Sequence, residues 1–220
     1  MAIELQFTPI LEQWPMLLKG AALTVGLTVE SALVGGFFAV IFAWTRIHGL
    51  PIFRWAVGAY VELIRNTPFI IQLFFLFFGL PSIGVMLSPL TASSIALVIN
   101  LSAYLTEIIR AGIEATPRSQ FEAAESLALT RMQTFLHVVL PPAMKKVWPA
   151  MVSQITIIML GSAVCGQIST EELSFVTNLI QSRNFRAFEA YIVGTSIYLL
   201  LAIGLRRLLV WAGSRFLFGR

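Results

Sequence analysis

Charged side chains are scarce in this sequence. Only 12% of its 220 residues are charged, whereas 57% are hydrophobic. Soluble domains usually carry about 25% charged residues, so this chain has too little polar side chain to cover a surface that faces water. We therefore expect an integral membrane protein with no large water-soluble domain.

Other absences exclude several classes of function. The single cysteine, Cys165, cannot form a disulfide within the chain and is expected to pack as an inert apolar side chain. The sequence contains no P-loop, HExxH, GxSxG or Cys/His cluster, so no nucleotide, metal or hydrolytic site is expected in it. No cation precedes Lys19, so the start of the chain is not expected to be a cleavable signal peptide. The chain by itself is therefore not expected to be an enzyme or to hold a cofactor.

Long apolar runs dominate the rest of the sequence. A helix needs about 20 apolar residues to cross a membrane. No segment is repeated, and no linker rich in Ser, Gly or Pro divides the chain. The sequence therefore predicts one all-helical membrane domain over residues 1–220. Its five expected spans lie at about 21–44, 55–80, 91–113, 147–168 and 188–211.

The basic residues predict the orientation of the chain. Lys and Arg number 15 against 11 Glu, and the sequence has no Asp. Most of these cations lie between runs one and two, between runs three and four, or at and beyond the end of run five. Cytoplasmic segments of membrane proteins carry such an excess. We therefore expect the N-terminus outside, the C-terminus in the cytoplasm, and no binding of nucleic acid.

The segment between runs three and four predicts a short cytoplasmic helix over about 119–130. Ser119 and Glu122 have the spacing of a capping box, so the helix is expected to begin at Ser119. Helices that lie on lipid usually carry cations on their polar face, whereas this one carries Glu122 and Glu125. A protein partner is therefore favoured over lipid. The apolar side is expected to contain Phe121, Ala124, Leu127 and Ala128.

This segment resembles the cytoplasmic loop of permease subunits of ATP-binding-cassette importers. That loop reads Glu-Ala-Ala, then Gly four residues on, then Ile-x-Leu-Pro. Val138 replaces the isoleucine here, and Ala128 stands in place of the glycine, which is expected to stiffen the bend. The resemblance assigns coupling to an ATPase to Ser119, Glu122, Ala123, Ala124, Ala128, Leu140 and Pro141.

Two further stretches resemble the branch of these importers that handles polar amino acids such as histidine, glutamine, glutamate, arginine and opines. Residues 60–68, with Gln72 and 78–81, look like its second span, and 102–112 look like its third. The resemblance implies the MetI-like, type I permease fold in a bacterial cytoplasmic (inner) membrane. It also implies a dimer of ATP-binding subunits that holds ATP and Mg²⁺, a second permease subunit, and an extracytoplasmic amino-acid-binding protein.

Span four departs from that branch. The branch typically reads Lys-Asp-(Thr/Ser)-Ser-Leu there, whereas residues 160–164 read Leu-Gly-Ser-Ala-Val. If the missing charges help to hold a substrate, this chain contributes less to the substrate site than its partner. We therefore favour a second permease that is a different chain over an identical copy.

Four charged residues inside the expected spans need partners, because a charge in a span costs roughly 2.5–3.5 kcal/mol on insertion. Spans two and three run antiparallel, which places Glu62 and Glu107 at similar depths, Arg65 somewhat deeper and Arg110 shallower. A cross-helix ion network is thus allowed, either to lock the two helices together, which is the commoner use, or to gate a path. Its expected members are Glu62, Arg65, Glu107 and Arg110.

Glu30 has no cation at a matching depth in span one. It is either neutral and hydrogen-bonded near Thr28 or Ser31, or exposed to a translocation path, and the sequence favours neither. The uncharged polar residues of the spans are further candidates for the path, although bonding between helices is their commoner use. The candidates for the substrate path are Glu30, Gln72, Asn100, Tyr104 and Ser162.

An ion-gradient-driven secondary transporter or channel subunit is the alternative function. In that case Glu30 is the candidate for proton coupling, and uptake needs no ATPase. The acidic loop helix and the absence of an internal repeat favour the ATP-driven importer.

Overall fold

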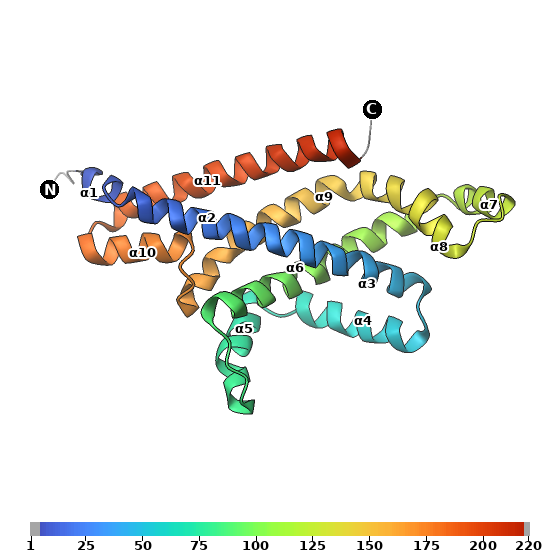
Figure 1. Cartoon of the computed structure of the whole chain (residues 1–220), viewed down its shortest axis with the longest axis horizontal. Helices are drawn as coiled ribbons and strands as arrows, with labels where there is room; N and C mark the ends of the chain where they lie inside the picture. Colours follow the sequence, from blue (N-terminus) through green and yellow to red (C-terminus); the bar gives the residue numbers. More distant parts are fainter. Residues whose placement is uncertain (1–4, 218–220) are drawn as a thin grey trace.

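The computed structural model describes residues 5–217, and these form helices and connecting loops without any strand. The all-helical prediction is confirmed. The long helices lie along one axis, with α10 (Leu173–Asn184) near one end and α7 (Arg118–Ser126) at the other (Figure 1). Residues 1–4 and 218–220 of the predicted domain lie outside the described residues.

Within residues 5–217, four continuous helices are long and apolar enough to cross a membrane, and a bent pair makes a fifth if it counts as one span. The first, Trp14–His48, begins seven residues or so before the expected 21 because the apolar character continues back to Trp14. The four helices are Trp14–His48, Pro89–Glu114, Arg131–Ile168 and Ala187–Arg215. Their main segments are α2 (Trp14–Glu30), η1 (Ser31–Gly35), α3 (Gly36–His48), α6 (Pro89–Glu114), α9 (Leu140–Gly161) and α11 (Ala187–Ala212).

The second expected span differs from a single helix over 55–80. Its two parts are α4 (Pro51–Arg65) and the segment Phe69–Ile83, and the chain bends by 108° between them. Pro68 lies at the break, because proline has no N–H to donate and disfavours helical geometry in the residue before it. The second part projects sideways from the bundle (Figure 1). It consists of α5 (Phe69–Phe74), η2 (Phe75–Gly79) and η3 (Leu80–Ile83).

Side-chain amides stabilise this bend. The Nε2 of Gln72 donates to the carbonyl oxygens of Ile64 at 2.8 Å and Thr67 at 3.1 Å, which the break leaves without helical partners. The Nδ2 of Asn100 on α6 donates to the Oε1 of Gln72 at 3.0 Å. The bend is therefore attached to the centre of the bundle.

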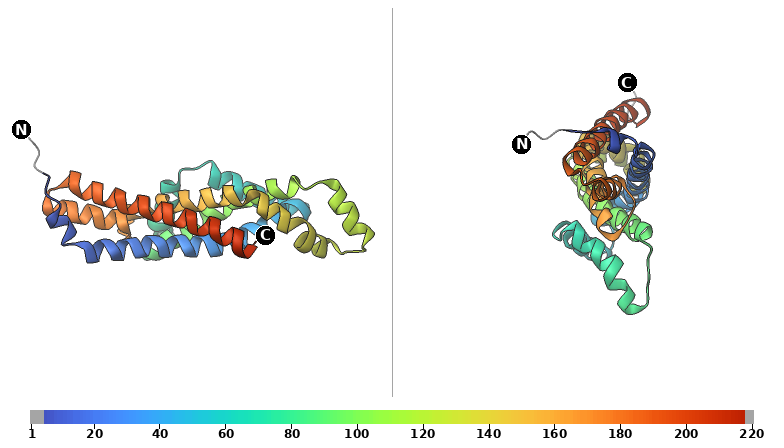
Figure 2. Two further views of the ribbon diagram at one scale, coloured as in Figure 1. Left: turned by 90° about the horizontal axis from the view of Figure 1, so that it is seen from above. Right: turned by 90° about the vertical axis from the view of Figure 1, so that its left-hand side faces the viewer.

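The core of the bundle is built around α6. In the most apolar stretch of α6, 61% of the residues are buried, whereas only 17% are buried in that of α11, so α6 is central and α11 peripheral. Helix α3 packs along α6 and so does η1, where a Cβ on Gly35 would lie 3.2 Å from the carbonyl oxygen of Val98. The end-on view shows the helices grouped around this centre, with the α5 segment to one side (Figure 2).

The helix that corresponds to the fourth expected span begins at Arg131, well before the expected 147. A short helix, α8 (Arg131–Gln133), leads into a π-helical segment, η4 (Thr134–Val139), and then into α9. Pro141 and Pro142 cannot donate to the preceding turn, and the wider π-helical segment just before them accommodates this loss. The helix ends in a 3₁₀ segment, η5 (Ser162–Ile168).

The segment between η5 and α11 also folds. Helix α10 packs on α2 and α11, and the short α1 (Thr8–Leu11) contacts the same end. The N-terminus of α10 is capped by Glu172, whose carboxylate accepts from the backbone N–H groups of Ser174 at 2.9 Å and Phe175 at 2.8 Å. Together these contacts make this end of the molecule a packed unit.

Candidate functional site

The predicted loop helix exists as α7, but its predicted capping box is wrong. The helix begins at Arg118 after the N-cap Pro117, and no side chain caps it. Pro117 already has the extended backbone of an N-cap, so Ser119 lies inside the first turn rather than before it. The capping box of this segment is formed instead by Thr130 and Gln133, at the start of α8.

The end of α7 is a Schellman turn. The N–H of Leu129 donates to the carbonyl of Ala124 at 3.1 Å, and the N–H of Ala128 donates to that of Glu125 at 2.9 Å. Ala128 has a φ of 53°, in the left-handed region that favours glycine. The helix therefore stops at Ser126 rather than at the expected 130, and the expected glycine position is the one that carries the backbone strain.

The two faces of α7 differ in exposure. Ala124 is buried and Phe121 is half-buried against the core, so these two residues attach the helix to the bundle. Ser119, Glu122 and Ala123 are exposed on the outer face. Leu127 was expected on the apolar side, but it is 73% exposed because it follows the last turn of the helix.

Aromatic contacts connect the loop to the first long helix. Helix α7 packs on η4, where the ring of Phe135 lies 4.4 Å from that of Trp44 on α3. Trp44 in turn stacks on His48 at 4.1 Å. A cavity of about 220 Å³ beside this stack is lined by Phe121 and Phe135, among others. Helix α7 is therefore connected to α3 through η4 and the Phe135–Trp44 contact.

The remaining predicted coupling residues lie at the start of α9. Leu140 is partly buried against the core, and Pro141 is exposed. Both follow the π-helical segment η4, on which α7 packs. The structure thus brings all seven candidates to one end of the molecule, on two adjoining segments.

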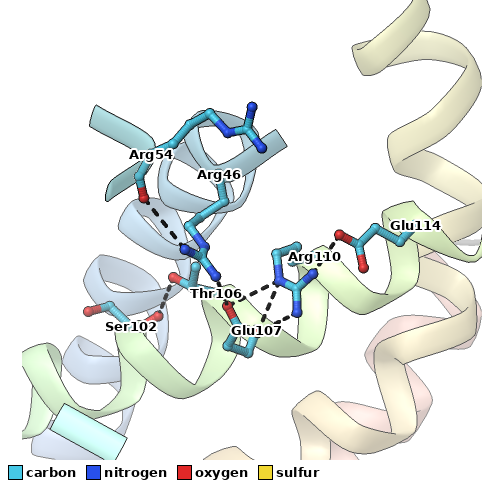
Figure 3. Close-up of polar contacts among 7 residues, drawn as sticks. All are labelled: Arg46, Arg54, Ser102, Thr106, Glu107, Arg110 and Glu114. Carbon is cyan, nitrogen blue, oxygen red and sulfur yellow. Dashed lines mark hydrogen bonds and ion pairs between the residues drawn. The ribbon is translucent and has the colours of Figure 1, made fainter. Parts of the chain in front are cut away.

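The predicted ion network forms with different partners (Figure 3). On α6, Glu107 and Arg110 are paired, with an Arg110 Nη2 to Glu107 Oε2 distance of 2.7 Å. Arg110 also pairs with Glu114. The contact between helices comes from Arg46 on α3, whose Nη2 lies 3.7 Å from the Oε1 of Glu107. Arg46 was assigned to a loop because the first run was expected to end at 44.

Glu62 and Arg65 do not join this network. Both are exposed on α4, whose buried face is formed by Gly58, Val61 and Ile64, and within residues 5–217 neither makes an ion pair. The guanidinium of Arg65 instead lies 5.5 Å from the ring centroid of Tyr104 on α6, in a cation–π contact. This contact joins Arg65, expected in the ion network, to Tyr104, expected on the substrate path.

The candidates for a substrate path differ in their burial and in their partners; Tyr104 is the one in contact with Arg65. Ser162 is fully buried, and its hydroxyl donates to the carbonyl oxygen of Met159 at 2.6 Å, so it lines no open path in this structure. Gln72 and Asn100 are occupied at the bend between α4 and α5. Glu30 is exposed and accepts from the hydroxyl of Ser94 on α6, rather than from Thr28 or Ser31. Among the candidates, only Glu30 combines exposure with a charge.

Comparisons with known proteins identify the family. The sequence matches the family described as "Binding-protein-dependent transport system inner membrane component" over residues 32–217. The chain belongs to this family. The permease is similar to the "Probable glutamine ABC transporter permease protein GlnM" of Bacillus subtilis (strain 168), with 37% identity over 79% of this chain and 81% of the relative.

Solved structures agree with this assignment. A chain from the "Crystal structure of an amino acid ABC transporter with histidines" matches the permease with a TM-score of 0.87 and 31% identity, over 95% of this chain and 98% of that one. A chain of the MetNI methionine ABC transporter in an inward-facing conformation matches with a TM-score of 0.70 and 21% identity, over 94% and 96%. The second match shows the fold alone, which is the expected MetI-like fold.

Sequence reasoning missed two features of the permease. The aromatic stack of Trp44, His48 and Phe135 was not expected, because no pattern along the chain connects residues so far apart. The second missed feature is Glu172, which is fully buried and accepts from the hydroxyl of Tyr198 as well as from the backbone. Burial raises the pKa of the Glu172 carboxyl, while its hydrogen bonds act in the opposite direction. Its place just before Leu173 was the available signal, because negatively charged side chains are favourable at the N-terminus of a helix.

Proposed function

We propose that the permease forms half of the translocation path of an ATP-driven importer for a polar amino acid. The observation that carries this proposal is α7, a short helix attached to the bundle through Phe121 and Ala124 while Glu122 and Ala123 face outward. Such a helix has its inner face fixed and its outer face free for a partner. The similarity to permeases named for glutamine and to an amino-acid transporter supports the class of cargo.

The proposed complex has three further components. A dimer of ATP-binding subunits holds ATP and Mg²⁺ and binds α7, and an extracytoplasmic protein delivers the amino acid to the opposite end. A second permease, a different chain rather than an identical copy, completes the path. The loss of charge at Leu160 and Gly161 and the burial of Ser162 support unequal halves, since this chain offers few polar groups there.

We place the α7 end in the cytoplasm and the N-terminus outside. Arg118, Arg131, Lys145 and Lys146 lie at or near the α7 end, which supports this orientation by the positive-inside rule. Cys165 is buried, so its replacement by Ala provides a background without cysteine. A membrane-impermeant maleimide added to intact cells is expected to label a cysteine placed at Glu171 and to spare one placed at Arg118. The reverse labelling would overturn this orientation.

The mechanism follows from the contacts of α7. ATP binding closes the two ATP-binding subunits and moves the docked helix. Because α7 packs on η4, and Phe135 of η4 touches Trp44, the motion reaches α3 and α9 together. Both helices pack on the central α6, so their displacement changes which side of the membrane the path faces.

Charge reversal on α7 tests the proposal. The Glu122 side chain is exposed, and no capping role is lost on its replacement, so Glu122→Lys is expected to leave the permease inserted and folded. In the complex isolated from native membrane and reconstituted, uptake driven by ATP should fall at least tenfold, or ATP hydrolysis should no longer respond to the binding protein. Glu171→Lys, an equal charge reversal at the opposite end, is the control and should retain coupling to ATP hydrolysis. Normal coupling in Glu122→Lys would contradict the docking role.

The position of Glu30 favours a second candidate function, transport driven by an ion gradient. It is an exposed carboxylate in the middle of a long apolar helix, hydrogen-bonded to Ser94, as a proton-coupling residue would be. An ion-gradient-driven transporter or channel subunit would take up solute without ATP. Uptake by the purified chain that collapses with a protonophore and in Glu30→Gln would establish this alternative in place of the ATP-driven importer.

A further inference from the structure

A basic hollow lies where the first long helix ends and α4 begins. It has a volume of about 270 Å³ and is lined by Arg46 of α3, Arg54 and Trp55 of α4, and Arg110 and Glu114 of α6. Three helices thus bring three guanidinium groups to one place (Figure 3). Neither the docking of α7 nor the candidate substrate path uses this hollow.

Cations outnumber carboxylates around the hollow. Arg110 pairs with both Glu107 and Glu114, so its charge is already compensated. Arg46 reaches Glu107 only at 3.7 Å, a long ion pair to a carboxylate that Arg110 already holds. Arg54 makes no ion pair with any residue from 5 to 217. Positive charge and guanidinium donors therefore remain available to an anion.

Arg46 is held in position for such a ligand. Its Nη1 lies over Gly58 of α4, where a Cβ would approach within 2.2 Å, and it is 3.5 Å from the carbonyl oxygen of Arg54. The guanidinium therefore lies close against the backbone of α4. The Nε of Arg46 is buried and has no hydrogen-bond partner among the described residues. The group thus lies beside α4 with donors that are incompletely satisfied.

Trp55 lines the hollow, and further exposed apolar side chains lie next to it in the sequence. Leu50, Ile52, Phe53 and Trp55 are each more than half exposed at the corner between α3 and α4. This corner joins the ends of two candidate spans, so these side chains lie at the membrane boundary, where tryptophan is enriched. A ligand that fits both parts carries an anionic head beside acyl chains.

We propose that this hollow binds the phosphate of an anionic phospholipid headgroup. Guanidinium groups match phosphate oxygens in paired hydrogen bonds, and the neighbouring apolar side chains contact the acyl chains. The site goes beyond the proposed transport function and does not depend on α7 or on an ATPase. By linking α3, α4 and α6 through one headgroup, the lipid stabilises the arrangement of these helices.

Native mass spectrometry of the full chain in mild detergent tests the site. Phosphatidylglycerol is compared with phosphatidylcholine of the same acyl chains, because both carry a phosphate but only the first has a net charge. The wild-type chain is expected to prefer phosphatidylglycerol, and Arg54→Gln to reduce that affinity about fivefold. Arg207→Gln, an exposed arginine on α11, is the matched control and should keep the preference. Equal affinity for both lipids, or an equal loss in both variants, would overturn the proposal.

Two further measurements separate a lipid site from a free-anion site and from misfolding. Inorganic phosphate at millimolar concentration should not displace phosphatidylglycerol, and full displacement would overturn the assignment to a lipid. Phosphatidylglycerol with brominated acyl chains should quench the tryptophan fluorescence of the chain more than brominated phosphatidylcholine does. Trp55→Phe keeps all three arginines and should remove most of that difference. An unchanged difference would place the bound lipid elsewhere and contradict the proposal.

Discussion

The two end helices of the permease, α10 and α7, are attached to the bundle in different ways. Helix α10 is capped by the buried Glu172, which also accepts from Tyr198 of α11, and the N–H of Leu173 donates to Thr24 of α2 at 3.2 Å. Helix α7 has no side-chain cap and buries only Ala124, with Phe121 half-buried. One helix is fixed by polar contacts to two others, whereas the other rests on a few apolar contacts.

This difference indicates which end moves. Many buried contacts raise the cost of local opening, and few contacts lower it. Helix α7 can therefore shift relative to the bundle when a partner pulls on it, while α10 stays with α2 and α11. The following changes are chosen to weaken or strengthen one end at a time.

The largest effect is expected from Glu172→Ala. It removes the cap of α10 and leaves two backbone N–H groups and the Tyr198 hydroxyl without their acceptor. We expect a loss of about 3 kcal/mol in the free energy of unfolding in mixed micelles. Glu171→Ala, at the exposed neighbouring position, should change it by less than about 0.5 kcal/mol. Equal losses in the two variants would show that the buried contacts of Glu172 do not hold α10.

A smaller effect is expected from Phe121→Ala at the other end. Phe121 is half-buried, so its truncation should destabilise the attachment of α7 by about 1.5 kcal/mol. Hydrogen exchange of the α7 amides should accelerate about tenfold, while α10 should be unchanged. Leu127→Ala, at a 73% exposed position, is the control and should leave the exchange of α7 as it is. Unchanged exchange in Phe121→Ala would mean that α7 is held by something else.

Ala128→Gly is expected to stabilise the end of α7 by up to about 1 kcal/mol. Alanine at φ 53° is strained and glycine is not, although glycine gains more entropy in the unfolded chain. Ala123→Gly, in the right-handed interior of the same helix, should have the opposite sign, a loss of about 1 kcal/mol. The exchange rates of the α7 amides measure both. A loss in both variants would show that the strain at Ala128 is not significant.

The smallest effect concerns pH. Since burial raises the pKa of Glu172, the folded chain holds this proton more tightly than the unfolded chain. The contribution of this carboxyl to stability is therefore full at acidic pH and declines as the pH rises from the ordinary range of a glutamate through the raised folded pKa. Glu172→Gln cannot ionise and should remove this decline. Melting temperatures of the two chains between pH 4 and 8 measure the effect, and identical slopes would contradict the assignment.

The sequence predicts the spans well because burial in lipid depends on the length of apolar runs. All four continuous helices contain an expected run. Arg131–Ile168 begins earlier than expected, because a helix continues through less apolar residues wherever its backbone hydrogen bonds can form. The break at Pro68 was missed because the length of an apolar run does not indicate where those hydrogen bonds are lost. The run 55–80 is long and mainly apolar, as a straight span would be. Only the effect of Pro68 on the local backbone, where it removes one donor, distinguishes the bent pair from a straight span.

The candidate site is less predictable, because partners depend on the angle at which helices meet. The sequence brings Glu107 and Arg110 together by spacing alone, since residues three apart share a helix face. It cannot show that Arg46, rather than Arg65, reaches Glu107 from another helix. Likewise, two segments fit the spacing of a capping box, and only the extended backbone at Pro117 excludes Ser119 in favour of Thr130.

Hydrogen exchange of the permease alone and in complex with its ATP-binding subunits tests the central claim most directly. If the lightly attached α7 is the docking helix, its amides between Arg118 and Ser126 should exchange at least tenfold more slowly in the complex. The amides of α10 should exchange equally in both samples. Slower exchange of α10 with no change in α7 would contradict the assignment of the two ends and the proposed coupling through α7.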